Sequence, residues 1–199
     1  MKIETILAQS GSRRDHQTGA ISTPIYQCAT FRHPALGQST GFDYSRTANP
    51  TRQALEQEMA LLEGGERGLA FSSGMAAVDN IIRLLAPGDK IVITEDLYGG
   101  TYRIFQKVYA QYGITAVYVD TSDTKAVEAA LEDKAVKMLF VEVPTNPMLK
   151  IADIKTLGEL AKKHGVIYVV DNTFLSPCVL RPLDFGADIV LHSATKYLG

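Results

Sequence analysis

The sequence predicts an α/β fold in which a mostly parallel sheet is covered by helices on both faces. From about residue 51 onward, short apolar runs alternate with helical stretches of about ten residues. The apolar runs are nearly continuous instead of alternating with polar residues, which is typical of strands buried on both sides. The sequence contains no internal repeat.

The first predicted helix spans Arg52–Glu63, where apolar residues recur at helical spacing. Thr51 is its expected N-cap and Gly64 its expected end. A short apolar run at Gly68–Phe71 predicts a strand, and a second helix is expected at Met75–Leu85.

The remaining predicted elements continue this alternation to the end of the chain. The expected strands are Lys90–Thr94, Thr115–Val119, Met138–Val143, Val166–Val170 and Ile189–Leu191. The expected helices are Tyr102–Tyr112, Thr124–Leu131 and Ile154–His164, the last of them ended by Gly165.

Residues 1 to about 50 differ from the rest, because they are rich in Gly, Ser, Thr, Pro and Gln and show no sustained period. Apolar side chains such as Ile21, Ile25 and Phe31 are costly to leave in water, so a disordered tail is disfavoured. We therefore expect an extended N-terminal arm over residues 1–50 and a domain over residues 51–199.

The composition argues against several classes of protein. The 199 residues carry 20 Lys+Arg and 22 Asp+Glu, so no broad positive field attracts nucleic acid or anionic lipid. Cys28 and Cys178 belong to no CxxC motif, which disfavours a disulfide framework. The N-terminus does not resemble a signal peptide, and no apolar stretch approaches the roughly 20 residues of a membrane span. We expect a cytoplasmic protein without nucleic-acid or membrane partners.

Common nucleotide and hydrolase motifs are missing. The chain has no GxGxxG after a strand, no GxxxxGK[ST] and no GxSxG, so a nicotinamide-binding Rossmann protein has only the α/β rhythm in its favour. The histidines show no metal-ligand spacing, and no metal site is expected. They are His16, His33, His164 and His192.

Three features lie at predicted strand ends, where ligands gather in parallel α/β sheets. Ser72–Met75 joins an apolar run to a helix N-terminus, whose free N–H groups could bind phosphate; a plain serine cap is equally consistent. Asp171 ends the most apolar strand and needs a cationic or N–H partner to stay charged, or else caps the following turn. Lys196 follows the last strand, where desolvation would make its amine nucleophilic; a surface lysine is the alternative.

Together these features suggest pyridoxal phosphate. This cofactor has an anionic phosphate, a pyridine nitrogen that must stay protonated, and an aldehyde that condenses with a lysine. Tyr98 could supply an aromatic face for its ring.

Six motifs then occur in an order that identifies a resemblance. They are Tyr44-Ser45-Arg46 with Asn49-Pro50-Thr51, Ser72-Ser73-Gly74-Met75-Ala76-Ala77, Tyr98-Gly99-Gly100-Thr101, Glu142 with Pro144-Thr145-Asn146-Pro147, Asp171-Asn172-Thr173, and Ser193-Ala194-Thr195-Lys196-Tyr197. Over essentially its whole length the chain resembles the Cys/Met-metabolism pyridoxal-phosphate enzymes, most closely the cystathionine gamma-synthases and gamma-lyases. The resemblance implies that residues 51–199 form the first part of an aspartate-aminotransferase-like large domain. The rest of that domain and a C-terminal domain are expected outside this sequence.

The resemblance also implies roles around the cofactor. Lys196 would hold it as an internal aldimine and later carry protons, and Asp171 would pair with the pyridine nitrogen. Tyr98 would stack on the ring and assist proton movement. Asn146 and Thr173 would also contact the ring. The phosphate would be bound by Gly74, Met75, Ser193 and Thr195.

The arm acquires a role by the same resemblance. Tyr44 and Arg46 would reach the phosphate of a neighbouring subunit, which implies a homotetramer built as a dimer of active dimers. Asp43 would bind the distal amino group of the amino-acid substrate, with Tyr98 and Asn146 also contacting substrate; an exposed loop carboxylate is the alternative for Asp43.

The expected reaction is gamma-replacement in transsulfuration, in which a homoserine ester and cysteine give cystathionine. Cystathionine gamma-lyase activity is the first alternative, and homoserine-ester sulfhydrylase or an inactive fragment that keeps the pocket are further ones. Methionine gamma-lyases carry a cysteine where this chain has Gly100, which argues against that activity.

Overall fold

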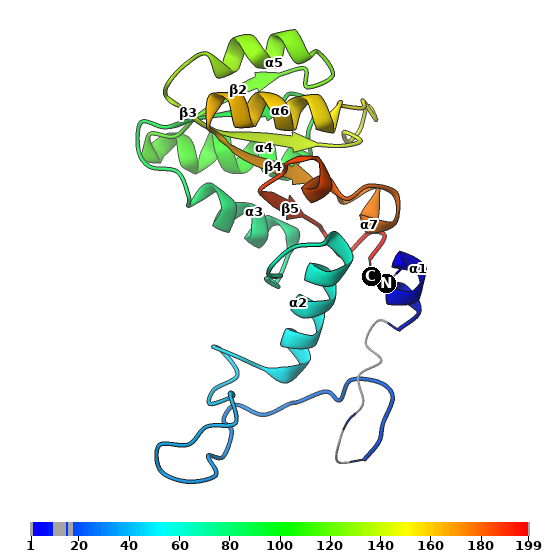
Figure 1. Cartoon of the computed structure of the whole chain (residues 1–199). Helices are drawn as coiled ribbons and strands as arrows, with labels where there is room; N and C mark the ends of the chain where they lie inside the picture. The colour runs from blue at the N-terminus through cyan, green and yellow to red at the C-terminus, as the bar shows by residue number, and fades with distance from the viewer. Residues whose placement is uncertain (1, 10–14, 16–17, 199) are drawn as a thin grey trace. The chain divides into compact units, whose positions relative to one another are not determined.

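The structure, a computed structural model, describes residues 2–9, 15 and 18–198. The chain forms two compact units, Met1–Ala70 and Phe71–Gly199. The predicted arm thus includes positions 1, 10–14, 16 and 17 that lie outside the described residues, and His16 is among them. Figure 1 follows the chain from the blue N-terminal helix to the red C-terminal strand.

The first unit contains helices α1 (Ile3–Ala8) and α2 (Pro50–Glu63) and a long extended segment. The prediction that Thr51 caps α2 is wrong, because the Asn49 side chain accepts the Thr51 backbone N–H at 2.9 Å. The Thr51 hydroxyl instead donates to the Pro24 carbonyl at 3.1 Å and so attaches the extended segment to α2. Gly64 ends the helix in the left-handed region, as expected.

The apolar run at residues 68–71 forms no strand, contrary to the sequence prediction. A Cβ at Gly68 would lie 2.1 Å from the carbonyl oxygen of Glu56, so the segment runs directly against α2. The backbone N–H of Ala70 donates to Glu56 Oε1 at 3.0 Å. The Ala70 N–H is therefore used on a side chain of the helix and not in a sheet.

The second unit is built on a parallel sheet of 5 strands in the order β2-β1-β3-β4-β5. The strands are β1 (Lys90–Thr94), β2 (Thr115–Val119), β3 (Val136–Glu142), β4 (Ile167–Asp171) and β5 (Ile189–Leu191). The predicted mostly parallel α/β fold is confirmed. The predicted bounds hold for β1, β2 and β5 and shift slightly for β3 and β4.

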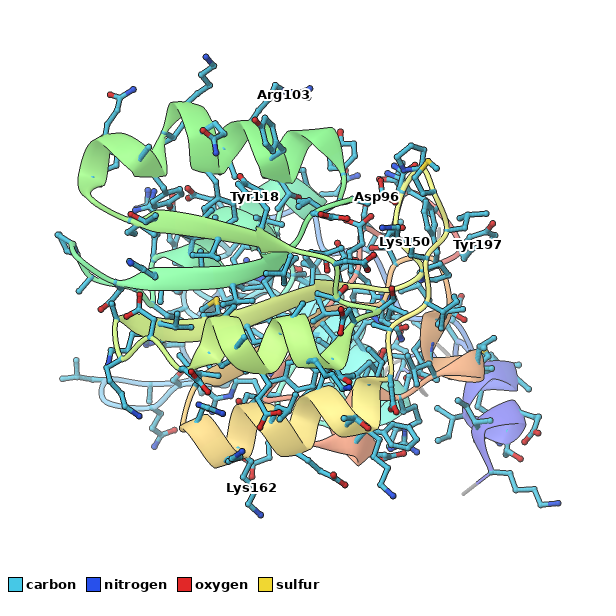
Figure 2. All side chains as sticks on the ribbon, turned by 90° about the horizontal axis from the view of Figure 1, so that it is seen from above. Asp96, Arg103, Tyr118, Lys150, Lys162 and Tyr197 are labelled. Carbon is cyan, nitrogen blue, oxygen red and sulfur yellow. The ribbon has the colours of Figure 1, made fainter. Side chains whose placement is uncertain are left out.

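Helices cover both faces of this sheet. Residues of α3 (Gly74–Ile82) and α4 (Gly99–Lys107) pack with Ile91, Ile93 and Phe140. Residues of α5 (Thr124–Leu131) and α6 (Ile154–His164) pack with the alternate strand residues, such as Val92 and Leu139. Figure 2 shows α4 on one side of the sheet and α5 and α6 on the other. This double burial explains the unbroken apolar strands.

The predicted continuous helix at Tyr102–Tyr112 is wrong in its second half. Helix α4 ends at Lys107, and a separate 3-10 turn, η1, spans Tyr109–Tyr112. The tighter turn accompanies a buried Tyr109 ring whose hydroxyl donates to Asp79 Oδ1 at 2.6 Å. Burial, and then this bond to Asp79, raises the pKa of Tyr109 to about 12. A tertiary contact thus ends the helix where local pattern would continue it.

Two short elements complete the unit, namely α7 (Ser176–Val179) and the 3-10 turn η2 (Pro182–Phe185). Among the residues that the structure describes, no helix combines the length and apolar composition needed to cross a membrane. The described part of the chain also brings together no group of three or more His, Cys, Asp or Glu side chains that could hold a metal ion.

The close approach of η2 to α6 leads to a first prediction. A Cβ at Gly158, inside α6, would lie 2.2 Å from the backbone oxygen of Phe185. Although Ala exceeds Gly in helix propensity by about 1 kcal/mol, Gly158→Ala should lower the free energy of unfolding by about 1–3 kcal/mol, because a backbone atom must move. Urea unfolding of the natural protein and of the Gly158→Ala variant measures this difference in unfolding free energy.

Gly99→Ala is the matched control. The nearest atom to a Cβ at Gly99 is the flexible end of Arg103, at 3.5 Å. This variant should unfold within about 0.5 kcal/mol of the natural protein. Equal stability of the two variants would contradict the packing described for Gly158.

Candidate functional site

A pocket of about 270 Å³ lies at the carboxyl ends of the strands in the second unit. The strand ends at Glu142, Asp171 and Leu191 contribute to its lining, as does the N-terminus of α3. All the predicted site residues of this unit line it. They are Gly74, Met75, Tyr98, Asn146, Asp171, Thr173, Ser193, Thr195 and Lys196.

Asp171 is the last residue of β4 and faces this pocket. Its Oδ1 accepts the Thr173 backbone N–H at 3.1 Å and the Thr173 hydroxyl at 2.5 Å. It therefore does cap the following turn, which is one of the two interpretations open from sequence. Burial raises the pKa of Asp171, while the Thr173 bonds and the charges of His192 and Lys196 oppose that change. A cation in the pocket would favour the ionised carboxylate.

Thr173 also connects β4 to the segment after β5. Its hydroxyl oxygen accepts the Ser193 backbone N–H at 2.9 Å while its proton goes to Asp171. The Ser193 hydroxyl in turn accepts from Lys196 Nζ at 3.2 Å. These bonds connect the Lys196 amine to the Asp171 carboxylate through Thr173 and the residue Ser193, which uses its backbone N–H for one contact and its hydroxyl for the other.

Lys196 departs from the sequence prediction in one respect. The side chain lines the pocket, but the residue is exposed, so the buried setting expected for it is wrong. The reason is its position on an irregular segment beyond β5, which spans only Ile189–Leu191. The amine therefore meets solvent on one side and the pocket on the other.

The N-terminus of α3 provides free N–H groups at the pocket. Ser73 caps the helix, since its hydroxyl accepts the Ala76 backbone N–H at 3.1 Å. A Cβ at Gly74 would lie 3.0 Å from the Cβ of Ser193, so the glycine lets the helix end approach the Ser193 segment closely. The serine-cap and anion-site interpretations are compatible here, because the cap uses only one of the terminal N–H groups.

Tyr98 precedes α4, with a half-exposed ring on the pocket. A Cβ at Gly100 would lie 2.3 Å from Tyr98 Cε1 and 2.9 Å from Met75 Sδ. The observed ring position therefore requires a glycine at residue 100.

Glu142, at the end of β3, is the site residue to which sequence analysis assigned no role. It is only 5% exposed, and its carboxylate accepts the backbone N–H groups of Tyr98 and Asn146 at 2.9 and 2.8 Å. Burial, with added repulsion from Asp171 and Asp96, raises the pKa of Glu142 to about 7 despite these two bonds. The available sequence signal was an acid near the end of an otherwise apolar strand.

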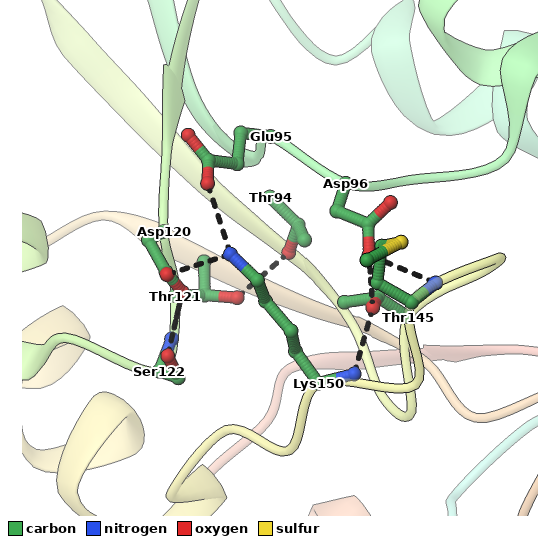
Figure 3. Close-up of polar contacts among 9 residues, drawn as sticks. Thr94, Glu95, Asp96, Asp120, Thr121, Ser122, Thr145 and Lys150 are labelled. Atoms are coloured by element: carbon green, nitrogen blue, oxygen red, sulfur yellow. Dashed lines mark hydrogen bonds and ion pairs between the residues drawn. The ribbon is translucent and has the colours of Figure 1, made fainter.

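A second polar network holds the loop that carries Asn146 (Figure 3). Lys150 Nζ donates to Asp120 Oδ2 at 2.7 Å and to Glu95 Oε1 at 3.1 Å. Asp96 accepts the Thr145 hydroxyl at 2.6 Å, and Figure 2 shows Asp96 and Lys150 together beyond the same end of the sheet. The bond from Lys150 is the main reason that the pKa of Asp120 falls to about 2. The loop is therefore attached to the ends of β1 and β2.

The remaining predicted site residues belong to the first unit, and the pocket lining comes from the second unit alone. The Arg46 guanidinium carbon lies 5.0 Å from the centre of the Tyr44 ring, a cation–π arrangement. Asp43 accepts the Ser39 hydroxyl at 2.7 Å and lies 2.8 Å from His33 Nε2.

The residues of the pocket fit pyridoxal phosphate. Asp171 is a partly buried carboxylate on the pocket, for which a protonated ring nitrogen would be a suitable partner. The α3 N-terminus, opened by Gly74, suits a phosphate, and the Lys196 amine is available for the aldehyde.

Comparison with known proteins agrees with this chemistry. The family of Cys/Met metabolism PLP-dependent enzymes matches residues 4–199. The cystathionine gamma-synthase/O-acetylhomoserine (thiol)-lyase of Bacillus subtilis is 52% identical over 197 residues, which are 99% of this chain and 52% of that protein. The cystathionine gamma-lyase of the same organism is 52% identical over 199 residues, which are 100% of this chain and 52% of that protein.

Solved structures show the same relation. Cystathionine gamma-lyase from Lactobacillus plantarum, complexed with L-serine, has a TM-score of 0.94 at 48% identity, covering 100% of this chain and 51% of that one. Cystathionine gamma synthase from Xanthomonas oryzae pv. oryzae, in complex with aminoacrylate and cysteine, has a TM-score of 0.95 at 39% identity with the same coverage. The chain spans about half the length of the curated relatives it matches.

With this match over nearly its whole length, and with a pocket whose residues suit the cofactor, the chain belongs to the family of Cys/Met metabolism PLP-dependent enzymes.

Proposed function

We propose that this protein catalyses gamma-replacement in transsulfuration, in the manner of a cystathionine gamma-synthase. An O-acyl- or O-phospho-homoserine would lose its ester group as the Cγ–O bond breaks. The thiol of cysteine would lose its proton and form the new Cγ–S bond of cystathionine. The observation that carries the proposal is the gathering of Lys196, Asp171 and the α3 N-terminus around one pocket.

The choice of replacement over elimination rests on residue 43 being an aspartate instead of a glutamate, because an acid at this position is itself shared by the gamma-synthases and the gamma-lyases. An aspartate directly before Tyr44-Ser45-Arg46 would bind the distal amino group of a cysteine-like or cystathionine-like ligand. Within the first unit the Asp43 carboxylate accepts the Ser39 hydroxyl and lies 2.8 Å from His33 Nε2, and these contacts orient it.

Cystathionine gamma-lyase activity is the principal alternative, and a relative of that name is as similar as the synthase. Homoserine-ester sulfhydrylase activity is another, since the first relative is also named an O-acetylhomoserine (thiol)-lyase. A chain that keeps the pocket without turnover is the third. Methionine gamma-lyase activity is disfavoured because this chain has Gly100 where methionine gamma-lyases carry a cysteine.

Each residue of the pocket would have a distinct task. When bound, pyridoxal phosphate supplies an electron sink for carbanions at Cα and Cβ. Lys196 would bind the cofactor through its amine and then move protons at these carbons as a base. Asp171 would pair with the protonated ring nitrogen, supported by Thr173. Tyr98 would cover the ring and assist proton movement. Asn146 would contact ring and substrate.

The phosphate would be held by the N–H groups of Gly74 and Met75 and by the hydroxyls of Ser193 and Thr195. We further propose a cytoplasmic homotetramer, a dimer of active dimers, in which residues 1–50 pack on a neighbouring subunit. Tyr44 and Arg46 would then reach the neighbour's phosphate. Their mutual contact supports this role, because a guanidinium and a phenol can donate to the same phosphate.

The covalent role of Lys196 can be tested by borohydride reduction of the natural protein followed by peptide mass mapping. A pyridoxyl adduct is expected on Lys196, and it should vanish from that peptide in Lys196→Ala. Lys162→Ala, at an exposed lysine on α6, serves as the control and should keep the adduct. An unmodified Lys196 in the natural protein would refute the cofactor assignment.

The reaction itself can be assigned from products. A homoserine ester and cysteine should give cystathionine. If the protein instead produces only 2-oxobutyrate and ammonia from cystathionine, the gamma-lyase alternative replaces the synthase. If neither reaction occurs in the natural protein, the proposed activity fails.

Asp171→Asn should have opposite effects on activity and on the stability of the cofactor-free protein. Loss of the charged partner of the ring nitrogen should lower kcat about tenfold to a hundredfold. Because burial raises the pKa of Asp171 when folded, the folded state binds its proton more tightly, and ionisation at pH 7 opposes folding. The neutral amide should therefore raise the thermal unfolding temperature without cofactor. A lower temperature would contradict this account.

A further inference from the structure

We propose that Glu142 is a positioning residue that fixes the two walls of the cofactor pocket relative to each other. Its Oε2 accepts the Tyr98 N–H at 2.9 Å, in the segment between β1 and α4. Its Oε1 accepts the Asn146 N–H at 2.8 Å, in the loop after β3. Both partners line the pocket, so one carboxylate joins two segments that are separated by 48 positions in sequence.

The chemistry of the two contacts requires a carboxylate. Both partners are backbone N–H donors, and an ionised carboxylate offers an acceptor on each oxygen. A glutamine amide keeps the shape but has an NH2 donor in place of one carboxylate oxygen, which leaves one of the two backbone N–H groups without an acceptor. An aspartate keeps the charge but shortens the reach. Neither conservative substitution should reproduce the bridge.

The backbone of Glu142 is itself fixed by a hydrogen bond to β1. Its backbone N–H donates to the Thr94 hydroxyl oxygen at 3.1 Å, and that hydroxyl lies 3.0 Å from the Thr121 hydroxyl in a buried pair. The end of β3 is thereby attached to the end of β1, from which the Tyr98 segment departs. The Glu142 carboxylate therefore extends from a backbone position that is fixed at the end of the sheet.

Charges around Glu142 make its bridging sensitive to pH. Asp171 is its register partner on β4, and Asp96 follows β1, so two acids face it from the neighbouring strands. Together with burial they raise its pKa to about 7, against the two N–H donors that favour ionisation. When pH falls through that value, one oxygen becomes a hydroxyl and accepts poorly. The bridge should then weaken on the acid side.

The inference rests on the proposed function for its catalytic consequence, but the bridge can be measured directly. In the natural protein, hydrogen exchange at single-residue resolution should find the Tyr98 and Asn146 amides protected, although both lie outside helices and strands. In Glu142→Gln, at least one of these two amides should exchange about tenfold faster or more. Unprotected amides in the natural protein would overturn the proposal, whether or not any variant folds.

Activity and cofactor spectra provide the second readout. Glu142→Gln should still form the borohydride adduct on Lys196, but kcat should fall about tenfold with a smaller change in KM. In Glu142→Gln the visible circular dichroism of bound cofactor should be weaker than in the natural protein. In the natural protein this signal should fall as pH drops below about 7, and in Glu142→Gln that fall should be absent. Glu142→Asp should also fail to restore the signal. Glu159→Gln, an exposed site on α6, is the matched control and should behave like the natural protein.

The outcomes separate the two claims. An unmodified Lys196 in the natural protein refutes the proposed function, while amide protection that depends on Glu142 still supports the bridge. A normal adduct with unchanged kcat, dichroism and amide protection in Glu142→Gln refutes the positioning role alone.

Discussion

The burial of both faces of a parallel sheet is the constraint on which this protein depends. Ile91 and Ile93 pack on one side while Val92 packs on the other, so the body of the sheet has no room for unpaired polar groups. Chemistry is therefore confined to the strand ends. There β3 and β4 finish side by side in Glu142 and Asp171. Two carboxylates on neighbouring strand ends need hydrogen-bond donors or cations to stay ionised, and residues of the pocket provide such donors to both.

The two acids obtain their donors in different ways. Asp171 receives a turn N–H and a hydroxyl from Thr173 and faces a pocket suited to a cationic ring nitrogen. Glu142 is satisfied by the protein's own backbone. One acid is thus arranged for a ligand and the other for the pocket walls. The network around Lys150 adds a further attachment for the Asn146 loop.

Much of this arrangement could be predicted from local pattern. The strands Lys90–Thr94 and Thr115–Val119 have the predicted bounds, because short runs rich in β-branched residues between turn residues admit few alternatives. Prediction failed where a distant contact decided the outcome. Tyr109 bonds Asp79 and ends α4 early, and Gly68 runs against α2 instead of joining a sheet. Asn49, and not Thr51, caps α2; both residue types are favoured at helix N-caps, so the local sequence did not distinguish them.

By itself the sequence determined the α/β class, the strand ends that carry Asp171, and the ordered motifs that mark the family, because these depend on periodicity and on neighbouring residues. Tertiary structure alone decided that Glu142 joins Tyr98 to Asn146 and that Lys196 is exposed. It also decided that residue 100 must be a glycine, because a Cβ there would meet the Tyr98 ring. Each of these depends on distances between side chains and backbone atoms brought together by folding, which no local pattern encodes.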